Sequence, residues 1–239
     1  MADGFAGFPK EAIAFLRGLK RNNRREWFQA RKDVYQAKVK APTLEMAAAL
    51  NEHLLRFAPG YVTDPQKAVF RIYRDTRFSR DKTPYKTNTS AVFTRRGLGK
   101  GACAGLYFSV SAEEIEVAGG FFMPRPEHFL KVRNHLAEHH ARFRVILQDR
   151  RLRAAMGELW DQKFARLPKG YSADHPAADL LLYKHWVLYK LLDPALAATP
   201  RLFKEVLKRF RLLIPFVDFL NEPLLAADRQ SRLRQMLNA

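Results

Sequence analysis

Apolar residues recur with a helical period over the first quarter of the chain. One apolar stripe covers residues 9–19, and a second stripe starts after Asn23. Pro42 predicts the end of that second helix, because proline lacks a backbone donor and fixes φ. A third helix is then predicted over residues 43–57. This pattern predicts a helical region covering residues 8–58.

The start of the second helix carries a recognisable capping pattern. Asn23 and Glu26 are three residues apart and fit a capping box. In that arrangement the Asn23 side chain accepts a hydrogen bond from a first-turn amide, and Glu26 reaches back to the cap amide. The sequence therefore predicts a helix N-terminus at Asn23.

The period of the apolar residues changes to two near residue 68. Four segments rich in β-branched or aromatic residues are predicted to be strands, at 68–75, 89–95, 105–111 and 115–121. The connections between them are short, and short connections favour antiparallel neighbours. We therefore predict an antiparallel meander over residues 68–122.

The remaining chain is predicted to be helical with one returning strand over residues 126–220, followed by an end helix or tail over 221–239. The predicted elements are a helix from Pro126, a second piece around 143–147, a short helix at 179–182, a strand at 186–191 and a long helix opened by Thr199-Pro200. Strands framed by runs of helices indicate the α+β class. A single domain over residues 1–239 is predicted, since no stretch resembles a linker.

Composition adds a strong positive charge to this picture. Hydrophobic residues make up 47% of 239, enough for a sizeable core, and 42 Lys and Arg against 24 acidic residues give a net charge of +18. Such a field attracts nucleic acid or phosphorylated small molecules, although it also serves solubility. The single Cys103 excludes an internal disulfide and agrees with a reducing compartment. Without a signal pattern or a membrane-spanning run, the cytoplasm is predicted, with no membrane partner.

Candidate chemistry concentrates in residues 70–88, where Lys and Arg side chains alternate with aromatic residues after a predicted strand. Asp75 and Asp81 can pair with some of these cations, which leaves others to converge on an external anion. The candidate anion-binding residues are Arg71, Arg74, Arg77, Lys82, Tyr85 and Lys86, with Tyr85 as a wall of the site. The predicted ligand is an anionic small molecule or a nucleic-acid backbone.

Two other interpretations of residues 70–88 stay open. In one, Arg71, Asp75, Arg77 and Asp81 form only a structural salt-bridge network, in an interaction protein. In the other, the protein is an enzyme acting on a phosphorylated or carboxylated substrate, with Asp75 or Asp81 as acid–base. The spacing matches neither a Walker loop nor a dinucleotide fingerprint, and no cofactor is predicted.

Histidines and a basic helix face were also considered as sites. His135 and His139 have the spacing of two metal ligands on a helix, with His128 upstream, but no third ligand is evident and no metal is predicted. His175 is interpreted as part of a helix cap. The basic stripe of the last helix, which could follow a phosphate backbone, is more commonly a solvated face; its residues are Arg201, Lys204, Lys208 and Arg211.

Four motifs carry a resemblance to a known family. They occupy residues 23–28, 70–87, 119–124 and 167–176. In these motifs the chain resembles the domain of unknown function family 2461, over nearly its whole length. The resemblance implies a single α+β domain and assigns no catalytic residue.

Overall fold

The computed structural model describes residues 4–99 and 101–237, and side chains as far as residue 226. Helices precede, follow and flank one four-stranded antiparallel sheet in these residues. The α+β prediction is confirmed.

The N-terminal region is helical, as predicted. Its elements are α1 (Lys10–Arg21), α2 (Arg25–Gln29), α3 (Lys32–Val34), the π-helical segment η1 (Tyr35–Lys40), α4 (Ala41–Phe57), the 3-10 turn η2 (Pro59–Tyr61) and α5 (Pro65–Ala68). The predicted end of the second helix at Pro42 is wrong, because the chain stays helical through this residue. Instead η1 continues directly into α4. Pro42 lies in the first turn of α4, where its missing N–H costs no α-helical hydrogen bond.

The sheet contains β1 (Asn88–Thr94), β2 (Gly105–Ser111), β3 (Ile115–Phe121) and β4 (Trp186–Leu192), in the order β1-β2-β3-β4. The last three strands of the predicted meander and the returning strand are therefore confirmed. The predicted strand 68–75 is wrong. Asp64 accepts a hydrogen bond from Gln66 N at 2.8 Å and starts α5 there, so the following residues make only isolated bridges, Val69 to Ala91 and Tyr73 to Tyr85.

The C-terminal region contains one helix that the sequence did not predict. Its helices are α6 (Pro126–Glu138), α7 (His140–Gln148), α8 (Arg150–Met156), α9 (Ala178–Leu181), the 3-10 segment η3 (Pro194–Ala198) and α10 (Arg201–Leu237). The unpredicted α8 begins at Asp149, whose carboxylate accepts a hydrogen bond from Leu152 N at 2.7 Å. The predicted break near residue 220 is absent, because α10 continues through Pro215 and Pro223. No helix in the described residues is long and apolar enough to cross a membrane.

The chain forms two compact units, each built from three separate stretches. Unit 1 comprises Met1–Phe93, Tyr107–Val117 and Leu191–Lys208, and unit 2 comprises Thr94–Leu106, Ala118–Lys190 and Arg209–Ala239. The single domain predicted from the sequence stays a prediction.

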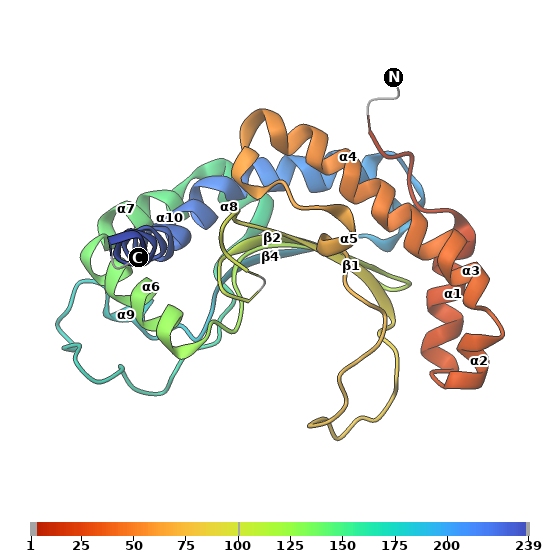
Figure 1. The fold of residues 1–239 in the computed structure, drawn as a ribbon, viewed down its shortest axis with the longest axis horizontal. Helices are drawn as coiled ribbons and strands as arrows, with labels where there is room; N and C mark the ends of the chain where they lie inside the picture. The colour runs from red at the N-terminus through yellow and green to blue at the C-terminus, as the bar shows by residue number, and fades with distance from the viewer. Residues whose placement is uncertain (1–3, 100, 238–239) are drawn as a thin grey trace. The chain divides into compact units, whose positions relative to one another are not determined.

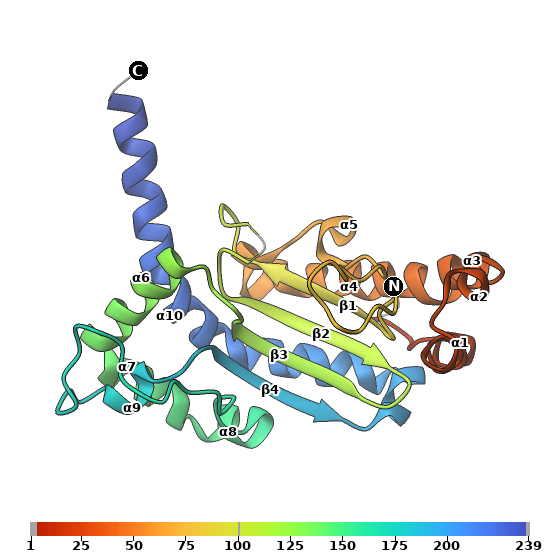
Figure 2. The ribbon, with the colours of Figure 1, turned by 90° about the horizontal axis from the view of Figure 1, so that it is seen from below.

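In unit 1, α4 covers one face of the sheet at β1 (Figures 1 and 2). A buried hydrogen bond of 2.8 Å between the hydroxyls of Thr43 and Thr89 joins the two elements. The chain between α5 and β1, here called the 69–87 segment, extends from the opposite face (Figure 1). The segment contacts α2 through Tyr73 and Tyr85, while its tip around residues 77–82 is largely exposed.

The core of unit 2 is rich in aromatic residues. Phe143 of α7 packs between Phe216 and Phe219 of α10, with ring centroids 5.6 and 4.9 Å apart. Gly119 of β3 faces Leu213, and a Cβ at Gly119 would meet the Leu213 side chain at 2.9 Å. A larger residue here would force the Leu213 side chain to move, so close packing of β3 against α10 favours glycine at this position.

Candidate functional site

The 69–87 segment is an irregular hairpin with its two arms joined by backbone hydrogen bonds. Arg74 N donates to Pro84 O at 2.9 Å, and Lys86 N donates to Ile72 O at 2.8 Å. Phe70 N donates to Ser90 O of β1 at 2.9 Å, which ties the base of the hairpin to the sheet. The hydrogen bond to β1 therefore holds the base of the hairpin on the sheet, as is expected for a functional loop.

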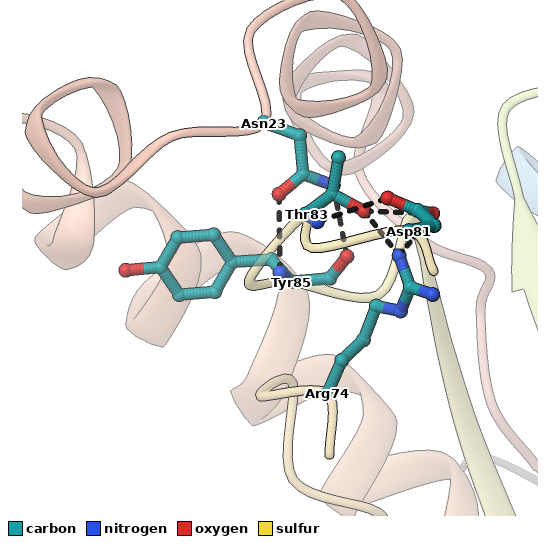
Figure 3. A network of polar contacts seen from close by, with 5 residues as sticks. All are labelled: Asn23, Arg74, Asp81, Thr83 and Tyr85. Carbon is teal, nitrogen blue, oxygen red and sulfur yellow. Dashed lines mark hydrogen bonds and ion pairs between the residues drawn. The ribbon is translucent and has the colours of Figure 1, made fainter. Parts of the chain in front are cut away.

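Asn23 fixes the returning arm of this hairpin from the loop after α1. Its Nδ2 donates to Tyr85 O at 2.8 Å, and its Oδ1 accepts from Tyr85 N at 3.0 Å (Figure 3). The predicted capping box is therefore wrong, since α2 starts without a side-chain cap. Both ends of the Asn23 amide are already occupied by Tyr85, so neither is free for the first turn of the helix.

The Tyr85 ring packs into the core. Its side chain is almost fully buried and stacks on Phe28 with centroids 4.2 Å apart and an interplanar angle of 18°. Tyr73 lies 5.4 Å away on another side of the ring. The ring points away from Arg74 and Asp81 (Figure 3). Tyr85 also lines the pocket described below, so its role as a wall of the site stays a prediction.

Arg74, Asp81 and Thr83 form a closed polar cluster inside the hairpin (Figure 3). Arg74 Nη1 donates to Asp81 Oδ2 at 2.5 Å and also to Thr83 Oγ1. Asp81 in turn accepts from Thr83 N at 2.9 Å and from Thr83 Oγ1 at 3.0 Å. The Thr83 backbone N–H, followed by the Arg74 and Thr83 side chains, lowers the pKa of Asp81 to about 2.

A second ion pair lies at the exposed tip of the hairpin. Arg77 Nε donates to Asp75 Oδ1 at 3.0 Å, and Arg77 Nη2 donates to Asp75 Oδ2 at 2.8 Å. These hydrogen bonds from Arg77 lower the pKa of Asp75 to about 2. Lys82 Nζ donates to Thr76 O at 2.9 Å. Arg77 and Lys82 thus interact within the tip, and neither lines the pocket described next.

A polar pocket of about 470 Å³ opens beside the base of the hairpin in unit 1. Its lining residues are Lys20, Asn23, Arg74, Asp81, Thr83, Tyr85, Lys86, Thr87, Asn88, Ser111, Glu113 and Glu114. They come from the end of α1, from the hairpin and β1, and from the β2–β3 turn. Three cations and three carboxylates share this lining with hydroxyl and amide side chains, so its charges nearly balance.

Most of these charges have protein partners. Arg74 pairs with Asp81, and Lys20 Nζ donates to the two Glu113 carboxylate oxygens at 2.6 and 2.5 Å. Ser111 holds the β2–β3 turn, since its Oγ accepts from Glu114 N at 2.9 Å. The carboxylates of this turn are therefore carried on a fixed backbone.

Lys86 is the exception among the pocket cations. Its side chain is half-buried, and Nζ lies 4.6 Å from the Phe70 ring centroid. Burial, and then the charge of the exposed Arg71, lower the pKa of Lys86. Within the described part of the chain, no carboxylate pairs with this ammonium group. Lys86 therefore carries a partly desolvated positive charge that a ligand anion could neutralise.

The acid–base interpretation of Asp75 and Asp81 gains little from this geometry. A carboxylate with a pKa of about 2 is a weak base at neutral pH, and efficient general bases have a pKa near the working pH. Both groups are also engaged by neighbouring arginines. The two aspartates are better suited to holding Arg74 and Arg77 in place.

The structure gives a separate result for each of the other candidate sites, which are the histidine pair at the end of α6, His175 and the basic stripe of α10. His135 and His139 have ring centroids 4.5 Å apart, but among the described residues no three His, Cys, Asp or Glu side chains gather as metal ligands would. His175 Nδ1 accepts from Ala177 N at 3.1 Å just before α9, in agreement with the cap interpretation. The basic stripe of α10 is exposed at its four residues, Arg201, Lys204, Lys208 and Arg211.

Comparison with models of protein families places this chain in a family. Residues 11–219 match the model of a family described as "Conserved hypothetical protein (DUF2461)". None of the curated proteins matches the chain. The matched region covers α1 after its first residue, every element from α2 to β4, the pocket, and α10 as far as residue 219. Because the family model matches nearly the whole chain, this protein belongs to the DUF2461 family.

Proposed function

We propose that the protein binds a small polar ligand with a phosphate or carboxylate group in the pocket of unit 1, and that Lys86 neutralises this group. The observation that carries the proposal is the half-buried Lys86 ammonium, which has no carboxylate partner among the described residues. Burying a charge without a partner is costly, so a structure that maintains one offers a favourable position for an opposite charge.

Arg74 supplies further donors next to Lys86. Its Nη1 is used by Asp81 and Thr83, while Nε and Nη2 make no hydrogen bond within the described residues. The Arg74 side chain is 26% exposed and lines the same pocket as Lys86, which gives a ligand access to the side chain. An ammonium group and one edge of a guanidinium together suit a phosphate or carboxylate.

The acidic lining narrows the class of ligand. Asp81, Glu113 and Glu114 would repel a polyphosphate or a long nucleic-acid backbone that filled the pocket. The same carboxylates can accept hydrogen bonds from ligand hydroxyls, and Thr87, Asn88 and Ser111 are also capable of such bonds. A sugar phosphate or a sugar acid combines one acidic group with several hydroxyls and fits this lining best.

The test compares two lysines of the same hairpin. Lys86→Ala removes the pocket ammonium, whereas Lys82→Ala removes one that is bound to Thr76 O outside the pocket. Thermal unfolding is measured with glucose 6-phosphate, gluconate, neutral glucose and a short single-stranded DNA, at two salt concentrations. Ligands that bind only the folded state raise the Tm. We expect glucose 6-phosphate or gluconate to raise the Tm of the wild type and of Lys82→Ala, but not that of Lys86→Ala.

Three other results would redirect the interpretation. A shift lost in Lys82→Ala and kept in Lys86→Ala would place the site at the hairpin tip. A salt-sensitive shift with DNA alone would favour the nucleic-acid backbone as partner. If no compound changes any Tm, the hairpin network is structural and the binding proposal fails.

The proposed setting is the reducing cytoplasm. Cys103 is a free, buried thiol, and burial raises its pKa to about 11. A thiol of this kind is inert and is not expected to take part in the function.

A further inference from the structure

Arg133 of α6 is a buried arginine without a hydrogen-bonding partner for one edge of its guanidinium. The residue is only 6% exposed, and its Nε and Nη2 are inaccessible to solvent and make no hydrogen bond with the residues that the structure describes. Buried polar groups in folded proteins are almost always paired, and a buried charge is costlier to leave unpaired than a neutral group. This guanidinium therefore needs an explanation beyond the packing of unit 2.

The two unpaired nitrogens lie on the same edge of the guanidinium. Nε–H and one Nη2–H point in parallel directions and form the fork that binds a carboxylate or phosphate with two hydrogen bonds. The protein itself uses this edge in Arg77, where Nε and Nη2 bind the two oxygens of Asp75 at 3.0 and 2.8 Å. Arg133 presents the same fork without an acid.

Two aromatic rings lie next to Arg133. The guanidinium carbon lies 4.0 Å from the Phe129 ring centroid and 5.6 Å from that of Phe164. Lys184 Nζ lies 5.6 Å from the same Phe164 ring. The Tyr171 hydroxyl donates a hydrogen bond to Asn134 Oδ1. A negative charge on Tyr171 would raise the pKa of Arg133. No carboxylate of the described residues pairs with Arg133, and burial lowers its pKa accordingly.

Phe164 is the movable part of this enclosure. Its side chain is 40% exposed, so its ring lies at the edge of the cluster. The backbone here is fixed, since Phe164 N donates to Leu182 O at 2.8 Å and Lys184 N donates to Gln162 O at 2.8 Å. Rotation of the Phe164 side chain would uncover this side of the Arg133 cluster without any opening of the chain. Rotations of partly exposed side chains are fast compared with loop opening.

We propose that Arg133 forms a second anion-binding site, in unit 2, where its Nε and Nη2 bind the carboxylate or phosphate of a ligand after the Phe164 side chain rotates away. Phe129 keeps its face on the guanidinium plane and leaves the fork edge directed at the anion. This site shares no residue with the pocket of unit 1 and does not depend on the function proposed there.

The experiment uses inorganic phosphate and succinate as probes, against chloride at constant ionic strength. All proteins carry Lys86→Ala, so that the pocket of unit 1 does not contribute. In this background the Tm is measured with Arg133 intact, with Arg133→Met, and with each of these combined with Phe164→Ala. Arg144→Met is the matched control, because Arg144 is an arginine of unit 2 whose Nη2 already binds Asp179 at 2.6 Å.

We expect phosphate or succinate to raise the Tm when Arg133 is present and to have no effect on Arg133→Met. The shift should be larger with Phe164→Ala, because that change exposes the fork. Without anions, Arg133→Met should be at least as stable as its parent, whereas Arg144→Met should be less stable.

The proposal is overturned if neither anion gives a shift that depends on Arg133, even with Phe164→Ala. If, in that case, the Tm of Arg133→Met without anions also falls as far as that of Arg144→Met, Arg133 stabilises the fold through its contacts with the aromatic rings. A shift that persists in Arg133→Met would place the anion elsewhere and would equally overturn it.

Discussion

The side-chain amide of Asn23 binds the backbone of Tyr85 as a neighbouring strand would, with Nδ2 donating to Tyr85 O at 2.8 Å and Oδ1 accepting from Tyr85 N at 3.0 Å. The two residues are 62 positions apart and lie in two different motifs of the family. Their hydrogen bonds fix the position of the Tyr85 backbone, so that the Tyr85 ring stacks on Phe28. It also positions the returning arm that carries Lys86 toward the pocket.

The first prediction separates this pairing from helix capping. Asn23→Ala leaves two partly buried backbone groups of Tyr85 without partners, and we expect the free energy of unfolding to fall by about 1–3 kcal/mol. Asn23→Asp keeps the acceptor but places a carboxylate against Tyr85 O, and should be no better than alanine. Urea unfolding measures both. An Asp variant as stable as the wild type would contradict the pairing, since Asp and Asn are equally good caps.

The second prediction concerns acid stability. The pKa of Asp81 falls from 3.8 to about 2 on folding. A lowered pKa stabilises the fold above the unfolded value, and this stabilisation is lost as the pH falls from 3.8 to about 2. Asp81→Asn should therefore be less stable than the wild type at neutral pH, and the difference should shrink across this window. Urea midpoints measured across the window test this.

Thr83→Val gives the matched comparison for Asp81. It removes the Thr83 hydroxyl but keeps the Thr83 backbone N–H, which is the largest cause of the lowered pKa of Asp81. We expect this variant to retain most of the acid-dependent loss of stability. A Thr83→Val variant that loses this dependence as fully as Asp81→Asn would assign the effect to side-chain contacts alone.

The parts of the fold predicted from the sequence are those that local patterns determine. β2 and β3 alternate apolar residues and end at short turns, and the apolar stripe of α4 has a helical period. The strand predicted over residues 68–75 failed, although Ile72 is buried and Arg71 is exposed, as alternation requires. Asp64 starts a helical turn just upstream, and the remaining residues find few backbone partners.

The candidate site was only partly predictable for a related reason. Residues 70–88 were found from their composition, but the pocket also depends on Lys20 and Glu113, which are 93 positions apart and carry no local signal. Tyr85 belongs to a run of polar and basic residues, so its burial against Phe28 could not be inferred from its neighbours. Side-chain pairing across long sequence separations is set by tertiary packing, and no motif in this chain encodes it.

The third prediction tests whether the Tyr85 ring is structural. Tyr85→Ala removes a buried ring that stacks on Phe28 at 4.2 Å, and should lower the free energy of unfolding by about 3–5 kcal/mol. Tyr85→Phe keeps the ring and should cost less than about 1.5 kcal/mol. Its ligand-induced Tm shift should equal that of the wild type. A stable Tyr85→Phe variant that lacks the ligand-induced Tm shift would show that the Tyr85 hydroxyl takes part in ligand binding.

The last prediction concerns Gly120 of β3. Its φ is +137°, and a Cβ there would lie 2.0 Å from Trp186 O, which belongs to the backbone of β4 and cannot move aside cheaply. Gly120→Ala should therefore lower the free energy of unfolding by more than about 4 kcal/mol. Gly170 has a φ of +97° with no atom within 4 Å of a built Cβ, so Gly170→Ala measures the backbone strain alone. We expect that control to cost about 1–2 kcal/mol. Equal losses in the two variants, measured by urea unfolding, would show that β3 and β4 separate easily and that the close approach at Trp186 is not required for folding.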